Sequence, residues 1–190
     1  MEALARLVGY LLRLAGWQVV GELPSHKKYI VIIAPHTSNW DFFVALALGL
    51  HWKAMRKTIW FGKHTIFVGV IGRFLRSLGG IPIDRSHPHR VVTQTIEAIN
   101  RREELILALA PEGTRKWTDH WKSGFYLIAL KTRLPVALAF IDYKNKRVGV
   151  GPVLHFTGQH EADWDAIRNF YRKEWARFPT DFSEIRSKRN

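Results

Sequence analysis

The sequence predicts an α/β fold: a single domain with a mostly parallel, mixed central sheet flanked by helices, preceded by an N-terminal amphipathic helix. Short apolar runs alternate with segments of helical periodicity along the chain. Most of these runs are continuously apolar, which is typical of strands covered on both faces. With 190 residues, 47% of them hydrophobic, and no repeat or linker, the chain predicts one core.

Residues 1–16 predict the amphipathic helix, and residues 17–190 predict the domain that follows it. Glu2, Arg6, Gly9 and Arg13 form a narrow polar stripe on an otherwise apolar helix. The two arginines interrupt a run that would need about 20 apolar residues to cross a bilayer, and the segment lacks the basic start and cleavage site of a signal peptide. Two interpretations stay open: the helix packs on the domain, or it lies in the plane of a membrane as an anchor.

The strands and helices that follow are assigned from periodicity and turn residues. The expected strands are Tyr29–Ala34, Thr58–Gly62, Ile81–Ile83, Leu105–Ala110, Pro135–Ile141 and Arg147–Val153. The last of these is expected to be an edge strand or a hairpin partner. The expected helices are Phe42–Leu50, Gly69–Leu78, Arg90–Asn100, Phe125–Thr132 and Asp163–Arg177.

The charge balance indicates an anionic partner but does not choose one. The chain has 29 Lys and Arg against 16 Asp and Glu, a net charge of +13. Such a surface attracts nucleic acid, anionic lipids or phosphorylated substrates. There is no cysteine, which excludes thiolate chemistry and Cys-based metal sites. His87 and His89 have no third ligand nearby, so no metal site is predicted.

Polar side chains follow the first core strand. His36 and Asp41 come after Pro35, where His36 can accept a proton and Asp41 can fix the tautomer of its ring. Asp41 can also cap the helix that begins there, and both roles are compatible. The same H-x4-D spacing recurs at His160 and Asp165, where no core strand precedes it, so that pair is interpreted as structural.

Two further strand ends carry polar side chains. The strand Leu105–Ala110 leads into Pro-Glu-Gly-Thr-Arg at 111–115, and the strand Ile81–Ile83 is followed by Asp84 and Arg85. In α/β sheets such strand ends meet at one edge and form the working site. Arginines beside a proton acceptor suit a phosphorylated or carboxylated substrate that carries a hydroxyl.

Four segments together resemble a known family. HTSNWD, GGIPIDR, PEGTR and LPVAL, in this order, resemble the motifs of the glycerol-3-phosphate and lysophosphatidic acid acyltransferase family across residues 29–140. Ala110 stands where the family usually has phenylalanine, and Lys116 where it often has serine. The stretch from Lys116 to Tyr126 resembles a subgroup of short bacterial members.

The resemblance implies an O-acyltransferase. The acyl group would pass from a thioester, acyl-CoA or acyl-carrier protein, to a hydroxyl of a lysophospholipid such as 1-acylglycerol-3-phosphate, without a bound cofactor. His36 would act as the general base, and Asp41 would orient its ring and stabilise its protonated form. By family position, Arg85 and Arg115 would hold the acceptor's phosphate. The other expected substrate contacts are Glu112, Gly113, Thr114 and, more weakly, Lys63.

Lipid substrates imply work at a membrane surface. Basic charge and an apolar helix supply two attachment signals for anionic lipids, and cytoplasmic thioesters imply a peripheral protein at the cytoplasmic face of the inner membrane. Two alternatives stay open: another acceptor, such as a lyso-aminolipid, or a lipid-binding protein without activity. A nucleic-acid module would explain the charge but not polar clusters at three strand ends, so no nucleic acid is expected.

Overall fold

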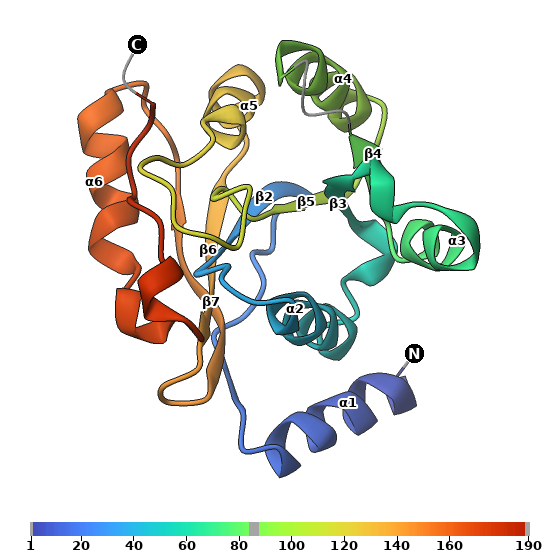
Figure 1. Ribbon diagram of the computed structural model, residues 1–190. Helices are drawn as coiled ribbons and strands as arrows, with labels where there is room; N and C mark the ends of the chain where they lie inside the picture. Colours follow the sequence, from blue (N-terminus) through green and yellow to red (C-terminus); the bar gives the residue numbers. More distant parts are fainter. Residues whose placement is uncertain (1, 84–87, 189–190) are drawn as a thin grey trace.

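A seven-stranded mixed sheet forms the centre of the protein, with the strand order β1-β7-β6-β2-β5-β3-β4 (Figure 1). The computed structural model describes residues 2–83 and 88–188. All neighbouring strands run parallel except β6 and β7, which are antiparallel. The strands are β1 Gln18–Val20, β2 Lys28–Ala34, β3 Thr58–Lys63, β4 Gly80–Ile83, β5 Leu105–Leu109, β6 Val136–Asp142 and β7 Arg147–Leu154. The predicted α/β class and mostly parallel sheet are confirmed.

Helices cover both faces of this sheet. Helices α4, α5 and α6 lie on one face, α2 lies on the other with α1 packed outside it, and α3 stands beside β4 at the sheet's edge (Figure 1). The helices are α1 Glu2–Leu14, α2 Trp40–His51, α3 Gly69–Ser77, α4 Pro88–Asn100, α5 Gly124–Thr132 and α6 His160–Phe170. Short 3-10 helices lie at Met55–Lys57, His64–Ile66, Lys173–Trp175 and Pro179–Asp181.

Strand β2 shows why the core strands are apolar throughout. Ile30 and Ile32 pack into the larger core cluster on the side of α4, α5 and α6, whereas Tyr29 and Val31 pack into a cluster on the opposite side. Alternate side chains of a strand point to opposite faces, so both faces of β2 are buried. This arrangement requires the unbroken apolar run seen in the sequence.

The parallel strands bring their carboxyl ends to one edge. Strands β6, β2, β5, β3 and β4 are consecutive in the sheet and share one direction. The segments that begin after Ala34, Leu109, Lys63, Ile83 and Asp142 therefore start at the same edge of the sheet. The polar clusters predicted from the sequence lie in the first, second and fourth of these segments.

Helix α1 packs on the domain, which is one of the two arrangements that the sequence left open; the membrane anchor stays a prediction. It packs on α2 through Ala5, Gly9 and Leu12, and a Cβ on Gly9 would lie 2.7 Å from Nδ1 of His51. Gly9, a member of the polar stripe, therefore faces a neighbouring helix at close range, whereas Glu2, Arg6 and Arg13 are exposed. The outer side of α1 is nevertheless apolar, with exposed Leu4, Leu7, Tyr10, Leu11 and Leu14.

Within residues 2–83 and 88–188, every helix falls short of the length and hydropathy that crossing a bilayer requires.

Two elements differ from the sequence prediction. The last helix ends at Phe170 rather than Arg177, because Tyr171 turns extended and its hydroxyl donates to the carbonyls of Ile32 and Ala139 at 2.9 and 3.1 Å. Strand β1 was not predicted, since three residues are too few to show periodicity. It pairs with β7 at Gly149, where any Cβ would lie 1.9 Å from the carbonyl oxygen of Val20.

Candidate active site

His36 and Asp41 form a close pair at the carboxyl edge of the sheet. Both lie in the turn from β2 into α2, and Nδ1 of His36 lies 3.2 Å from Oδ2 of Asp41. The Asp41 side chain is 2% exposed and that of His36 is 22% exposed. Because Nδ1 faces the carboxylate, Nε2 is the ring nitrogen available to a substrate.

Two further groups hold the Asp41 carboxylate in place. The backbone N–H of Ser38 donates to Oδ2 at 2.8 Å, and the hydroxyl of Tyr143 donates to Oδ1 at 2.6 Å. Asp41 thus closes the turn before α2 and also pairs with His36. The expected helix cap was wrong, because Asn39 occupies the N-cap position of α2 and makes no side-chain capping hydrogen bond. Tyr143 follows β6 and is 102 residues away in the chain. No spacing or motif in the sequence pointed to it.

Glu112 lies beneath the His36 turn. It follows β5, is 0% exposed, and its Oε1 accepts the backbone N–H of His36 at 2.6 Å. Burial raises the pKa of Glu112 to about 7, although hydrogen bonds from the His36 N–H and from Ser183 oppose the rise. The structure therefore shows a contact that positions the His36 backbone. The expected contact between Glu112 and a substrate stays a prediction.

The other residues of the Pro-Glu-Gly-Thr-Arg turn present a cation at the edge. Gly113 adopts the left-handed region with φ at 67°, which glycine tolerates without strain. The Thr114 hydroxyl accepts the N–H of Lys116 at 3.2 Å and closes a local turn. Arg115 is exposed and forms no hydrogen bond or ion pair with the described part of the chain. Its guanidinium is free to bind an anion.

Lys63 supplies a second cation at this edge. It is the exposed last residue of β3 and lies beside Ile83 in the register with β4. Arg85, the other arginine expected to hold a phosphate, lies outside the described residues, as does His87. The structure thus brings His36, Asp41 and Glu112 into contact and places Lys63 at the same edge.

The C-terminal segment closes over the His36 turn from the other side. The N–H of Phe178 donates to the Thr37 hydroxyl at 3.2 Å. The guanidinium of Arg177 lies 5.7 and 5.8 Å from the ring centroids of Trp40 and Tyr143. Sequence periodicity assigned Arg177 to the end of a helix and gave no sign of these contacts.

The second H-x4-D pair has different partners. Nε2 of His160 lies 2.9 Å from the hydroxyl of Ser187, and Nδ1 lies 3.5 Å from Glu161. Asp165 instead pairs with Arg168 at 2.6 Å. The spacing alone therefore does not bring the two side chains together, whereas the turn after β2 does.

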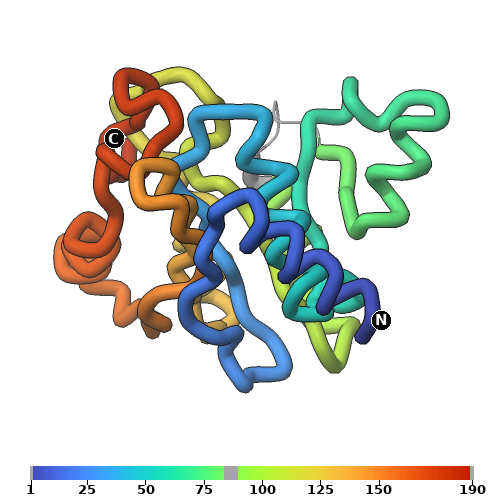
Figure 2. Tube along the Cα trace, turned by 90° about the horizontal axis from the view of Figure 1, so that it is seen from below, coloured from blue at the N-terminus to red at the C-terminus, as the bar shows by residue number. Residues whose placement is uncertain are grey.

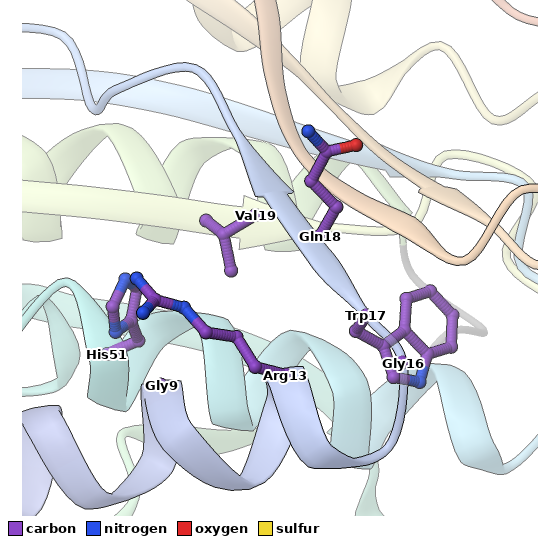
Figure 3. Close-up of a pocket in the computed structure, with 7 residues that line it drawn as sticks. All are labelled: Gly9, Arg13, Gly16, Trp17, Gln18, Val19 and His51. Atoms are coloured by element: carbon purple, nitrogen blue, oxygen red, sulfur yellow. The ribbon is translucent and has the colours of Figure 1, made fainter.

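A groove of about 420 Å³ lies elsewhere, between α1, α2 and β1. Arg13 extends toward His51 along it, and Trp17 and Gln18 line its far side (Figure 3). No His–Asp pair lines this groove, so it is separate from the site at the sheet edge. Among residues 2–83 and 88–188, no three His, Asp or Glu gather as a metal-binding group.

Comparisons with known proteins give one consistent family. A family model described as Acyltransferase matches residues 17–141. The chloroplastic 1-acyl-sn-glycerol-3-phosphate acyltransferase BAT2 of Brassica napus is 32% identical over 128 residues, 63% of this chain and 34% of that protein. A 1-acyl-sn-glycerol-3-phosphate acyltransferase of Streptococcus pneumoniae is 25% identical over 60% of this chain and 42% of that protein. One of Cocos nucifera is 31% identical over 56% of this chain and 35% of that protein.

The matches thus span less than half the length of these curated relatives. No solved structure matches the chain.

The buried Glu112 generates a pH prediction for stability. Its folded pKa of about 7 exceeds the ordinary value of 4.5, so its contribution to stability is complete below about pH 4.5 and is lost as the pH rises toward 7. The unfolding free energy of the unchanged protein should therefore fall relative to that of Glu112→Gln as the pH rises. The difference between the two proteins should change by about 3 kcal/mol, in favour of the variant, from pH 4.5 to pH 7. Urea unfolding at both pH values measures this change.

Glu103, which is exposed, provides the control through Glu103→Gln. The unfolding free energy of the control should differ from that of the unchanged protein by the same amount at both pH values. If the difference between Glu112→Gln and the unchanged protein also stays constant with pH, the raised pKa of Glu112 is contradicted.

Proposed function

Because the chain belongs to the acyltransferase family, we propose that it transfers a fatty acyl group from an acyl thioester to a hydroxyl of a lysophospholipid. The relatives' names support 1-acylglycerol-3-phosphate as the acceptor. The donor is acyl-CoA or acyl-carrier protein, used as a substrate. The observation that carries the proposal is the His36–Asp41 pair, in which the His36 side chain is partly exposed and the Asp41 side chain is buried.

His36 acts as the general base. Its Nε2 accepts the proton of the acceptor hydroxyl while the oxygen attacks the thioester carbonyl. The tetrahedral intermediate collapses, the C–S bond breaks, and the thiolate takes the proton back from the imidazolium. Asp41 lies 3.2 Å from Nδ1, where it fixes the tautomer and stabilises the positive ring. No protein nucleophile is required, because the acceptor's own oxygen attacks.

Three contacts hold this pair in the geometry that the reaction needs. The Ser38 N–H and the Tyr143 hydroxyl fix the Asp41 carboxylate, and Glu112 fixes the backbone of His36. Tyr143 takes up Oδ1, so that Oδ2 is directed at the imidazole. Tyr143 is a positioning residue in this mechanism, since its contact is with Asp41 and not with a substrate.

Cations at the edge bind the acceptor's phosphate. Arg115 is exposed without a described partner, and Lys63 lies at the end of β3. Arg85 joins them by its place in the motif that follows β4 in the sequence, and Gly113 and Thr114, next to Arg115 in the chain, are further contacts of the acceptor in this proposal. A guanidinium binds phosphate through two parallel hydrogen bonds. This set selects a phosphorylated acceptor over a neutral one.

The protein works as a peripheral protein at the cytoplasmic face of the inner membrane. Its net charge of +13 attracts anionic lipids, and the exposed leucines of α1 add apolar area that salt does not screen. Nucleic acid has no part in this proposal, because the basic residues are scattered along the chain and scattered charge does not explain polar clusters at three strand ends.

The two H-x4-D pairs provide a matched test of the base. His36→Ala should lower acyl transfer by about 100-fold or more, because general-base catalysis contributes on that order. His160→Ala should retain near-normal rates. Transfer of a labelled acyl group to a panel of lysolipids, including a lyso-aminolipid, measures both variants.

Equal effects of the two substitutions would contradict the assignment of His36. Transfer to the lyso-aminolipid alone would replace the acceptor proposed above while keeping the base.

Tyr143→Phe removes only the hydroxyl that holds Asp41. The kcat should fall about tenfold with little change in KM, since a hydrogen bond to a charged group contributes about 1.5–3 kcal/mol. The acid limb of the pH–rate profile should also move to higher pH, because a carboxylate that no longer shares its charge holds the protonated imidazole more strongly. A fall in kcat with an unchanged pH profile would indicate a purely structural role.

Arg115→Ala should raise the KM for the lysophosphatidic acceptor by about 30-fold or more, since a charge-assisted contact worth about 2–3 kcal/mol is lost. The KM for the donor should change little. Arg102→Ala, at an exposed arginine after α4, is the matched control. Equal increases for donor and acceptor in the Arg115 variant would place the arginine at the donor instead.

A further inference from the structure

The segment from residue 42 to residue 83 carries positive charge alone. It contains no Asp or Glu, and its Lys and Arg residues are Lys53, Arg56, Lys57, Lys63, Arg73 and Arg76. The acidic residue that precedes the segment, Asp41, is buried and paired with His36. Lys53 is paired with Glu2, and Arg56 and Lys57 precede β3 at the other edge of the sheet. Lys63, Arg73 and Arg76 lie at the end of β3 and on α3 and form no ion pair within the described residues, so this part of the surface favours an anionic partner over a neutral one.

Helix α3 lies within this segment and exposes an apolar face. Val70, Ile71 and Phe74 are 71%, 69% and 57% exposed, and Val68, just before the helix, is 71% exposed. These large apolar side chains follow one another along the helix. They form a continuous apolar patch, unlike exposed apolar residues that are scattered singly over a surface. Arg73 is exposed beside them.

The packing of α3 prevents this face from turning inward. Gly72 is the buried residue of the helix, and a Cβ on it would lie 2.2 Å from the backbone carbonyl carbon of Phe67. At 100° per residue, positions two before and two after Gly72 lie on the opposite side. Val70 and Phe74 therefore point outward for as long as Gly72 stays in contact with Phe67.

A chain of aromatic rings joins α3 to the active-site turn. Trp60 lies 5.7 Å from Phe67 and 5.0 Å from Phe42, measured between ring centroids, and Phe42 lies 5.7 Å from Phe43. Phe43 and its neighbour Trp40 are 56% and 57% exposed. Trp40 and Phe43 lie in the first turn of α2, directly after His36 and Asp41.

We propose that the outer face of α3, together with Trp40 and Phe43, inserts into an anionic bilayer and sets the His36 edge at the lipid surface. The proposal rests on the proposed function, which needs a lipid acceptor to reach His36. Figure 1 shows α2 on one face of the sheet and α3 beside β4 at its edge, and Figure 2 shows α1 running across α2. Helix α1 alone would attach the protein without bringing this edge to the lipid.

A bilayer fits this face better than a protein partner does. The exposed side chains form a convex helical ridge, and a fluid acyl layer covers such a ridge without matching its shape. A protein partner or a second copy would need a complementary groove to bury the same residues. Arg73 and Arg76 on α3, with Lys63 at the end of β3, match phospholipid headgroups, and each cation adds about 1 kcal/mol near an anionic surface.

The test compares three double variants of the full chain. The vesicles contain roughly one-third phosphatidylglycerol in phosphatidylcholine, and binding is measured by sedimentation. The double variant Val70→Asp, Phe74→Asp should bind them about tenfold more weakly, or weaker still. Leu127→Asp with Val153→Asp makes the same chemical change at exposed positions away from α3 and should bind as the unchanged protein does. Leu7→Asp with Leu11→Asp measures the part contributed by α1.

Transfer to a vesicle-embedded acceptor should fall with binding in the α3 variant, and transfer to a short-chain, water-soluble lysolipid should persist. Normal vesicle binding by the α3 variant, with loss only in the α1 variant, would overturn the proposal. Two other results would also overturn the proposal. In one, the α3 variant binds vesicles normally but no longer binds acyl-carrier protein. In the other, the unchanged protein is a dimer and the α3 variant is a monomer. Inactivity of the unchanged protein on every lysolipid would instead refute the proposed function, because sedimentation does not depend on catalysis.

Discussion

The buried Asp41 carboxylate is the group on which the rest of the site depends. At 2% exposure it cannot be solvated, and a buried carboxylate is tolerated only where hydrogen bonds replace water. Its two oxygens take donors from Ser38 and Tyr143 and face the imidazole of His36. The first and last of these come from one turn, and Tyr143 comes from the β6–β7 hairpin. Folding of the sheet is therefore required before the pair can exist.

The protein achieves this by surrounding one short turn with segments that are distant in the sequence. Glu112 holds the backbone from below, Tyr143 holds the carboxylate from the side, and the N–H of Phe178 holds the Thr37 hydroxyl. Two of these three come after residue 141, where the match to the family model ends. His36 and Asp41 lie inside the shared region, and a portion of the chain outside it fixes their geometry. Such contacts give a loop the precision of a rigid element.

The sequence predicted the features that depend on local pattern. Continuous apolar runs predicted the core strands, and the polar residues after β2 and β5 predicted where the site lies, because parallel strands place those ends together. It missed what depends on contacts at long range. Tyr143 meets Asp41 across 102 residues, and the end of α6 is set by the hydroxyl of Tyr171 reaching two strands. The close contact of Gly9 with α2 was missed as well, because periodicity does not reveal a neighbouring helix.

Glu112 shows how the charge state of the site follows from its burial. Desolvation disfavours the ionised carboxylate, and the nearby Asp41 disfavours it further, so that its pKa rises to about 7. The neutral acid still accepts the His36 N–H through its carbonyl oxygen, so protonation does not break the bond that holds the turn. In the mechanism proposed above, a second ionised carboxylate beside Asp41 would bind the protonated imidazole more tightly and slow the return of its proton to the leaving thiolate. Below about pH 7, where Glu112 is mostly protonated, it positions His36 without adding that charge.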